Sequence, residues 1–221
     1  MKNLKLFTKK ILTAFGITVL LLSISCNEDL LTEVPKDFLS PDVTYKNQAG
    51  FEAGIAALYN NARGYIARNE GIHEKGWEVL FGQGADIGWH INITSFVSDY
   101  RTVTPFDGTS RQIWMKSYSV IKDANTIITR AEAEDVEWDS EEGKNRIVAE
   151  ARFFRAYAYR YLVHMYGGVP IIREELTGPK LDFVRDPVDD VLAFMLEDLE
   201  FGAQNLPAAN SDGAHVTKGA A

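Results

Sequence analysis

Hydrophobic residues recur at helical spacing in four stretches of the chain. The first stretch covers about residues 47–67, and Asn47 can cap it. Its apolar positions share one stripe of a helical wheel: Phe51, Ile55, Leu58, Tyr59, Ala62 and Ile66. The second covers about residues 110–133, with Ser110 as the candidate cap. Its stripe is Ile113, Trp114, Tyr118, Ile121, Asn125 and Ile128. Both patterns predict amphipathic helices.

The third stretch, about residues 140–166, is apolar on almost every side. It can begin at Asp139 or Ser140, and the run Gly167–Pro170 is a strong stop signal. A helix of this kind must be buried on most sides, so we predict a central helix in a stack. Its arginines are too frequent for a membrane span, and we expect two of them, with a nearby glutamate, to pair with the acidic segments between helices. These three residues are Arg152, Arg155 and Glu150.

The fourth stretch begins at Asp186 and ends by Leu206–Pro207. Asp186 is the expected N-cap, because Pro187 suits the first position of a helix. The expected buried stripe is Val188, Val191, Leu192, Met195, Leu196 and Leu199. Residues 169–173 before it should be extended, and residues 216–221 should begin one more helix.

Two other regions lack helical spacing. Residues 27–43 contain prolines, so we expect an extended strap that lies against the body. Residues 70–109 are rich in glycine and should form long irregular loops. The predicted fold is therefore all-α, built of helix pairs with long irregular loops.

The N-terminus has the form of an export signal. Four lysines precede a short apolar run, which is too short to span a bilayer, and the sequence Leu22–Cys26 is similar to a bacterial lipobox. We therefore expect residues 1–25 to be a lipoprotein signal peptide and Cys26 to be lipidated, since several acyl chains give a stable anchor. An ordinary secretory signal with an incidental cysteine is the alternative.

The net negative charge of the chain limits the kinds of molecule that it can bind. The formal net charge is −8, and the first 25 residues hold four lysines and no acidic residue, so a processed chain is more acidic still. Such a chain disfavours nucleic acid, because phosphate binding needs clustered lysine and arginine. Neutral ligands such as sugars are unaffected by net charge.

Four segments together resemble the SusD/RagB family of outer-membrane glycan-binding lipoproteins. The strongest match is AEARFFRAYAYRYLVHMYGGVPII, at residues 149–172, which is similar to the family's hallmark helix. The other three are FLSPDVTYKNQAGFEAGIAALYNNA, IWMKSYSVIKDANTIITRA and RDPVDDVLAFMLEDLEFGAQNLP. Their order and spacing agree with the family as well, over nearly all of the mature chain.

The resemblance implies tetratricopeptide-like helix pairs, a binding surface on loops, and a partner SusC-like TonB-dependent transporter in the outer membrane. It divides the chain into the signal peptide, the lipidated cysteine with the strap (26–46), and the helical domain (47–221). Family members are much longer, so this domain should be an N-terminal portion. The expected function is non-enzymatic: a lipid-anchored protein, facing the cell exterior, captures glycans and passes them to the transporter.

Glycan binding requires exposed aromatic rings with amide and carboxylate groups around them. Residues 84–101 meet this description best. Trp89 and Tyr100 can stack on a sugar, while Asp86 and Asn92 can bond hydroxyls. The alternative role for Trp89 is to fix an irregular loop to the helices.

Other chemistry has little support. The four histidines and one cysteine form no metal-binding motif, and no phosphate loop or nucleophile elbow is present, so we expect no metal and no cofactor. His164 should be a packed or partly exposed residue of the central helix. Two alternatives stay open: a helical scaffold lipoprotein that binds protein or peptide, and a helical glycoside hydrolase whose carboxylate pair lies in the loops.

Overall fold

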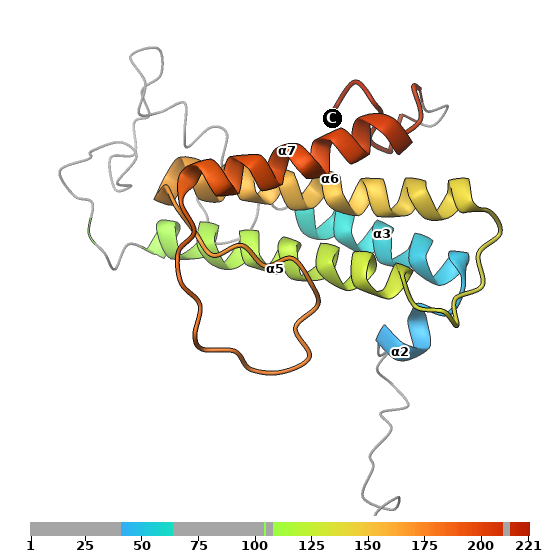
Figure 1. Ribbon diagram of the computed structural model, residues 1–221, viewed down its shortest axis with the longest axis horizontal. Helices are drawn as coiled ribbons and strands as arrows, with labels where there is room; N and C mark the ends of the chain where they lie inside the picture. The colour runs from blue at the N-terminus through green and yellow to red at the C-terminus, as the bar shows by residue number, and fades with distance from the viewer. Residues whose placement is uncertain (1–40, 64–103, 105–107, 210–212) are drawn as a thin grey trace, which may run out of the picture. The chain divides into compact units, whose positions relative to one another are not determined.

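A computed structural model of the 221-residue chain describes residues 41–63, 104, 108–209 and 213–221, all of which lie within one compact unit. The helices of these residues are α2 (Pro41–Thr44), α3 (Gln48–Ala62), α5 (Gly108–Ala131), α6 (Glu141–Tyr166) and α7 (Val188–Asn205) (Figure 1). The described residues contain no strand, only one isolated bridge between Asn47 and Glu137. The all-α prediction is confirmed for this part of the chain.

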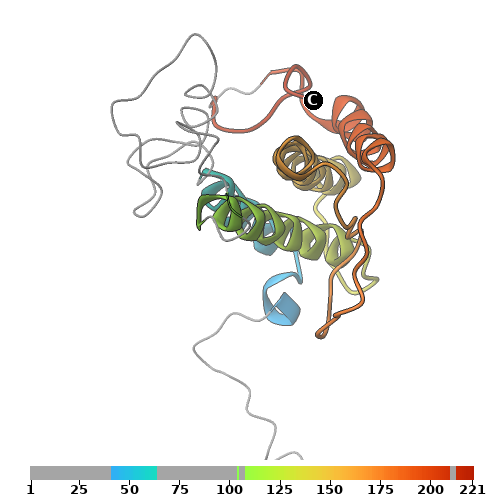
Figure 2. The same ribbon diagram turned by 90° about the vertical axis from the view of Figure 1, so that its left-hand side faces the viewer.

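Helix α6 is the central element. It packs against α3, α5 and α7, and the end-on view shows it between α7 on one side and α5 with α3 on the other (Figure 2). Phe154 and Tyr161 are buried and Phe153 is half-buried, as expected for a helix that is apolar all round. Small residues such as Ala151 and Ala158 are fully buried and let the neighbouring helices approach closely.

Two of the four predicted caps are confirmed. The side chain of Asn47 accepts from the backbone N–H of Gly50, and that of Ser140 accepts from Gly143. The other two predictions are wrong. Helix α5 begins at Gly108, so Ser110 lies inside it. The carboxylate of Asp186 accepts from the backbone N–H of Ile171 instead of capping α7, which has no side-chain cap.

The predicted buried face of α7 is only partly right: Val191 is buried and Met195 and Leu199 are half-buried, as expected. Its buried residues are Val191, Phe194, Asp198 and Gly202. Three members of the predicted stripe are exposed instead: Val188 (40%), Leu192 (44%) and Leu196 (57%). The buried face contains a carboxylate and a glycine, which weaken its apolar signal in the sequence.

Two local predictions at the ends of the described region need correction. Residues 41–44 form a short helix where an extended strap was expected; its proline stands at the first position, where the missing N–H costs nothing. Residues 218–220 form a turn rather than the start of a helix, with Ala220 N–H donating to the Thr217 carbonyl. None of the helices among the described residues combines the length and apolar character that crossing a membrane requires.

Candidate functional site

The residues predicted to bind glycan lie outside the described part of the chain. Asp86, Trp89, Asn92 and Tyr100 all fall within residues 64–103, and Cys26 falls within residues 1–40. Their roles therefore stay predictions. A candidate site can be built from the described residues alone, at a pocket beside α5.

This pocket, called the α5 pocket below, has a volume of about 350 Å³. Helix α5 contributes one wall: Trp114, Tyr118, Ile121, Lys122 and Asn125. The segment between α6 and α7 contributes the other: Pro170, Ile172, Glu174, Leu176 and Phe183. Most of these side chains are aromatic or aliphatic, so the interior is suited to a ligand with an apolar face.

The aromatic wall of the α5 pocket is held by ring contacts. The ring centroids of Trp114 and Tyr118 lie 4.9 Å apart and are tilted, and Trp114 meets the ring of Tyr166 edge-on at 5.1 Å. Residues 114 and 118 are one helical turn apart, so both rings leave α5 on the same side. Trp114 was predicted to lie on a buried stripe of the helix, whereas the structure leaves it half-buried at the pocket.

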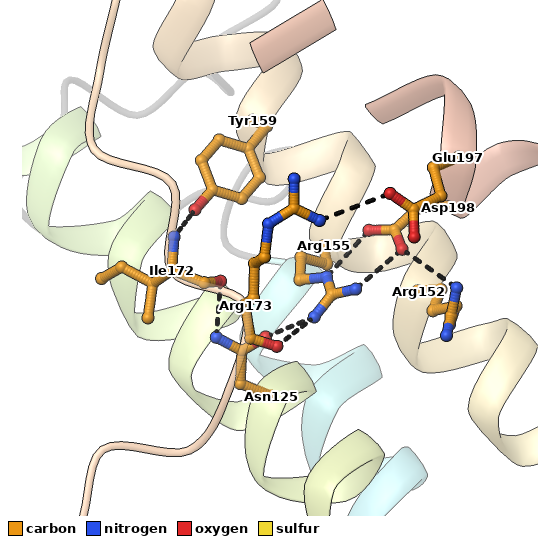
Figure 3. Close-up of polar contacts among 8 residues, drawn as sticks. All are labelled: Asn125, Arg152, Arg155, Tyr159, Ile172, Arg173, Glu197 and Asp198. Carbon is orange, nitrogen blue, oxygen red and sulfur yellow. Dashed lines mark hydrogen bonds and ion pairs between the residues drawn. The ribbon is translucent and has the colours of Figure 1, made fainter. Parts of the chain in front are cut away.

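The opposite wall rests on a buried ion pair. Arg155 on α6 donates to both carboxylate oxygens of Asp198 on α7, at 2.8 and 2.7 Å (Figure 3). The side chains are 4% and 0% exposed. The remaining guanidinium nitrogen of Arg155, Nη1, donates to the Asn125 side-chain oxygen at 2.7 Å and to the Arg173 carbonyl at 2.9 Å. This bidentate geometry gives each buried charge several partners.

Two opposing effects act on the pKa of the Asp198 carboxyl. Burial raises the pKa of its carboxyl, while the hydrogen bond and charge of Arg155 lower it; the balance lies above the ordinary value. Arg152 adds a longer contact of 3.8 Å to the same carboxylate. The prediction that Arg152 and Arg155 pair with acids between helices is therefore wrong, because their partner stands inside α7.

The same wall is fixed by three further polar contacts. The Asn125 amide donates to the Ile172 carbonyl at 2.8 Å, and the Ile172 N–H donates to the Tyr159 hydroxyl at 2.7 Å (Figure 3). The Tyr118 hydroxyl donates to the Pro170 carbonyl at 2.8 Å. Burial raises the pKa of Tyr159 to about 12 and also raises the pKa of Tyr118. Helices α5 and α6 thus supply the backbone partners of Pro170, Ile172 and Arg173, while the Ile171 N–H donates to Asp186.

A second hollow of about 720 Å³ lies between α3 and α6, with Tyr59, Phe153, Phe154 and Tyr157 in its wall. Tyr59 accepts from the backbone N–H of Val216, which also lines the hollow. The hydroxyl of Tyr157, in the same wall, lies 3.0 Å from that of Tyr161.

Glu150 is fully buried beside this second hollow. Arg146 donates to one of its carboxylate oxygens at 2.5 Å, and His215 Nδ1 lies 2.8 Å from the other. Its predicted pairing with the acidic segments between helices is wrong. His164 is exposed, and its Nδ1 lies 2.7 Å from the Arg160 carbonyl. No group of three or more metal-binding side chains comes together within the described residues.

Comparisons with known proteins give a consistent result. A SusD-like family model described as "Starch-binding associating with outer membrane" matches residues 37–221. A SusD-like protein of Bacteroides ovatus is 29% identical over 221 residues, which cover 99% of this chain and 38% of that protein.

Two solved structures are similar in sequence and in fold. One, of a laminarin-binding SusD-like protein, has 26% identity and a TM-score of 0.62, and the match covers 79% of this chain and 38% of that one. Another, a crystal structure with xylogluco-oligosaccharide, has 26% identity and a TM-score of 0.57, covering 76% and 32%. This chain therefore spans less than two fifths of the length of the relatives it matches.

Proposed function

The chain belongs to the SusD-like family, and on this premise we propose that the protein captures oligosaccharides at the cell surface and passes them to a partner TonB-dependent transporter. The observation that carries the proposal is the family match over residues 37–221. The names of two similar structures support the ligand class, because one binds laminarin and the other is described with a xylogluco-oligosaccharide.

The proposed mechanism is local concentration rather than catalysis. A lipid on Cys26, following cleavage of residues 1–25, would hold the helical domain (47–221) at the outer face of the outer membrane. Aromatic stacking by Trp89 and Tyr100, with hydroxyl contacts from Asp86 and Asn92, would give weak and rapid binding. One stacked ring contributes about 1 kcal/mol, so the affinity should be modest and should grow with glycan length.

A direct test measures oligosaccharide binding by the full chain and by Trp89→Ala. Loss of one stacked ring should weaken binding by about fivefold to tenfold. Met115→Ala is a suitable control, because Met115 is 56% exposed on α5 and has no part in the proposed site. If the full chain binds no oligosaccharide in a broad panel, the proposal is wrong.

One observation favours the scaffold alternative, in which the ligand is a protein or peptide. Leu192 and Leu196 are exposed on α7, and Leu181 on the preceding segment is 97% exposed. Exposed apolar side chains of this size are common at protein contacts. Binding to peptides but to no glycan would support the scaffold function over the proposed one.

A further inference from the structure

We propose that the α5 pocket binds an aromatic ring carried by a saccharide, such as an aryl glycoside or an aroyl ester. This inference rests on the proposed function, because the saccharide defines the ligand class to which the ring is attached. It adds a second contact, distinct from the predicted residues 84–101, that would select substituted glycans over plain ones.

The interior of the pocket fits an apolar ring. Trp114, Tyr118 and Phe183 place three aromatic side chains around a volume of about 350 Å³, which is enough for one six-membered ring and its attached group. Two wall residues remain exposed, Leu176 at 42% and Phe183 at 40%. A bound ring would cover both, and aromatic pairs gain free energy beyond the area they bury.

The two uncharged polar side chains that line the pocket, Asn125 and Tyr118, are already hydrogen-bonded within the protein. The Asn125 amide donates to the Ile172 carbonyl, and its oxygen accepts from Arg155. The Tyr118 hydroxyl donates to Pro170. A fully hydroxylated sugar buried here would therefore leave hydroxyl groups without partners, which costs more than the burial of a ring.

The two charged residues of the pocket favour a position for the saccharide next to them, with the aromatic ring in the apolar interior. Lys122 on α5 and Glu174 on the opposite wall both line the pocket, and both are exposed to solvent. Within the described ranges, no hydrogen bond or ion pair of either side chain is found. Lys122 can donate to a sugar hydroxyl and Glu174 can accept from one, so opposite charges on the two walls complement a group that both donates and accepts.

The test compares matched phenyl and methyl glycosides of glucose and xylose by calorimetric titration of the full chain. We expect the phenyl glycosides to bind about tenfold more tightly. Phe183→Ala should abolish this preference. Leu181→Ala is the matched control: it lies on the same segment, is 97% exposed and does not line the pocket, so the preference should persist.

Equal affinity for phenyl and methyl glycosides overturns the ring site, while oligosaccharide binding measured on the same preparation decides the proposed function separately. Binding of N-acetylphenylalaninamide as tight as that of phenyl glucoside, with the same loss in Phe183→Ala, would assign the pocket to peptide side chains and overturn the saccharide assignment. A preference that survives Phe183→Ala places the ring elsewhere and also overturns it.

Discussion

The two halves of the segment between α6 and α7 differ sharply. In residues 169–173, Val169 is buried, and the backbone or side chains bond to α5, α6 and α7. In residues 176–184, Leu181 and Val184 are 97% and 76% exposed. Both halves have apolar side chains, so hydropathy alone does not separate them. The difference lies in the polar partners that α5 and α6 supply to the first half and not to the second.

This contrast bears on how the α5 pocket can work. Its inner wall, at Pro170 and Ile172, is fixed to the helices, whereas its outer wall, at Leu176 and Phe183, is about two fifths exposed. A site of this kind separates stability from binding. Changes in the first half should destabilise the fold, and changes in the second should mainly alter what the protein binds.

The largest expected effect comes from removing the ion pair beneath the first half. Asp198→Ala leaves Arg155 buried without its carboxylate, and the free energy of unfolding should fall by about 3 to 5 kcal/mol, measured by urea denaturation. Glu197→Ala is the control. It removes the pair with Arg173, whose side chains are 58% and 59% exposed, and should cost at most about 1 kcal/mol. Similar losses in the two variants would show that the buried pair stabilises the fold no more than an exposed pair does.

The next largest expected effect is a loss of stability at alkaline pH. Burial raises the pKa of Tyr159 to about 12 from an ordinary value of 10.0, so the folded state keeps the phenol proton that the unfolded chain releases. The stabilising contribution is therefore complete below pH 10 and is lost as the pH rises towards 12. The loss should approach about 2 to 3 kcal/mol, measured by urea denaturation at each pH.

Tyr159→Phe provides the control for this pH dependence. Its phenylalanine cannot ionise, so the decline in stability above pH 10 should become shallower. The half-buried tyrosines Tyr59 and Tyr118, whose pKa values are also raised, will preserve part of the decline. The variant should also lose about 1 to 3 kcal/mol at neutral pH, because the Ile172 N–H loses its acceptor. An unchanged slope above pH 10 would show that burial of the Tyr159 phenol does not raise its pKa in the folded protein.

The helices were predictable because their signal is local. Caps at Asn47 and Ser140 act over three residues, and the burial of α6 follows from its own apolar composition. The ion pair was not predictable, because Arg155 and Asp198 are 43 residues apart. Within α7, Asp198 resembles its exposed acidic neighbours Glu197 and Glu200, so nothing in the local pattern marks it as buried.

The α5 pocket was not predictable from the sequence for the same reason. Trp114 and Tyr118 stood out as aromatic residues at helical spacing, and such spacing usually indicates core packing. Their exposure depends on where the segment after α6 crosses α5. One of the bonds that hold this segment comes from Asp186, which the sequence indicated as a helix cap but which accepts from the Ile171 N–H. A competition between two backbone donors for one carboxylate is decided by tertiary structure, not by sequence pattern.

The smallest expected effect tests the second half directly. Leu181→Ser and Val184→Ser change side chains that are 97% and 76% exposed, so each should alter the free energy of unfolding by no more than about 0.5 kcal/mol in urea denaturation. Val169→Ser, on the first half, changes a fully buried side chain of similar chemistry and should cost about 1 to 3 kcal/mol. A large loss in either exposed variant would mean that this part of the segment is covered in solution. The two halves would then differ in their hydrogen-bond partners but not in how far their side chains are exposed to solvent.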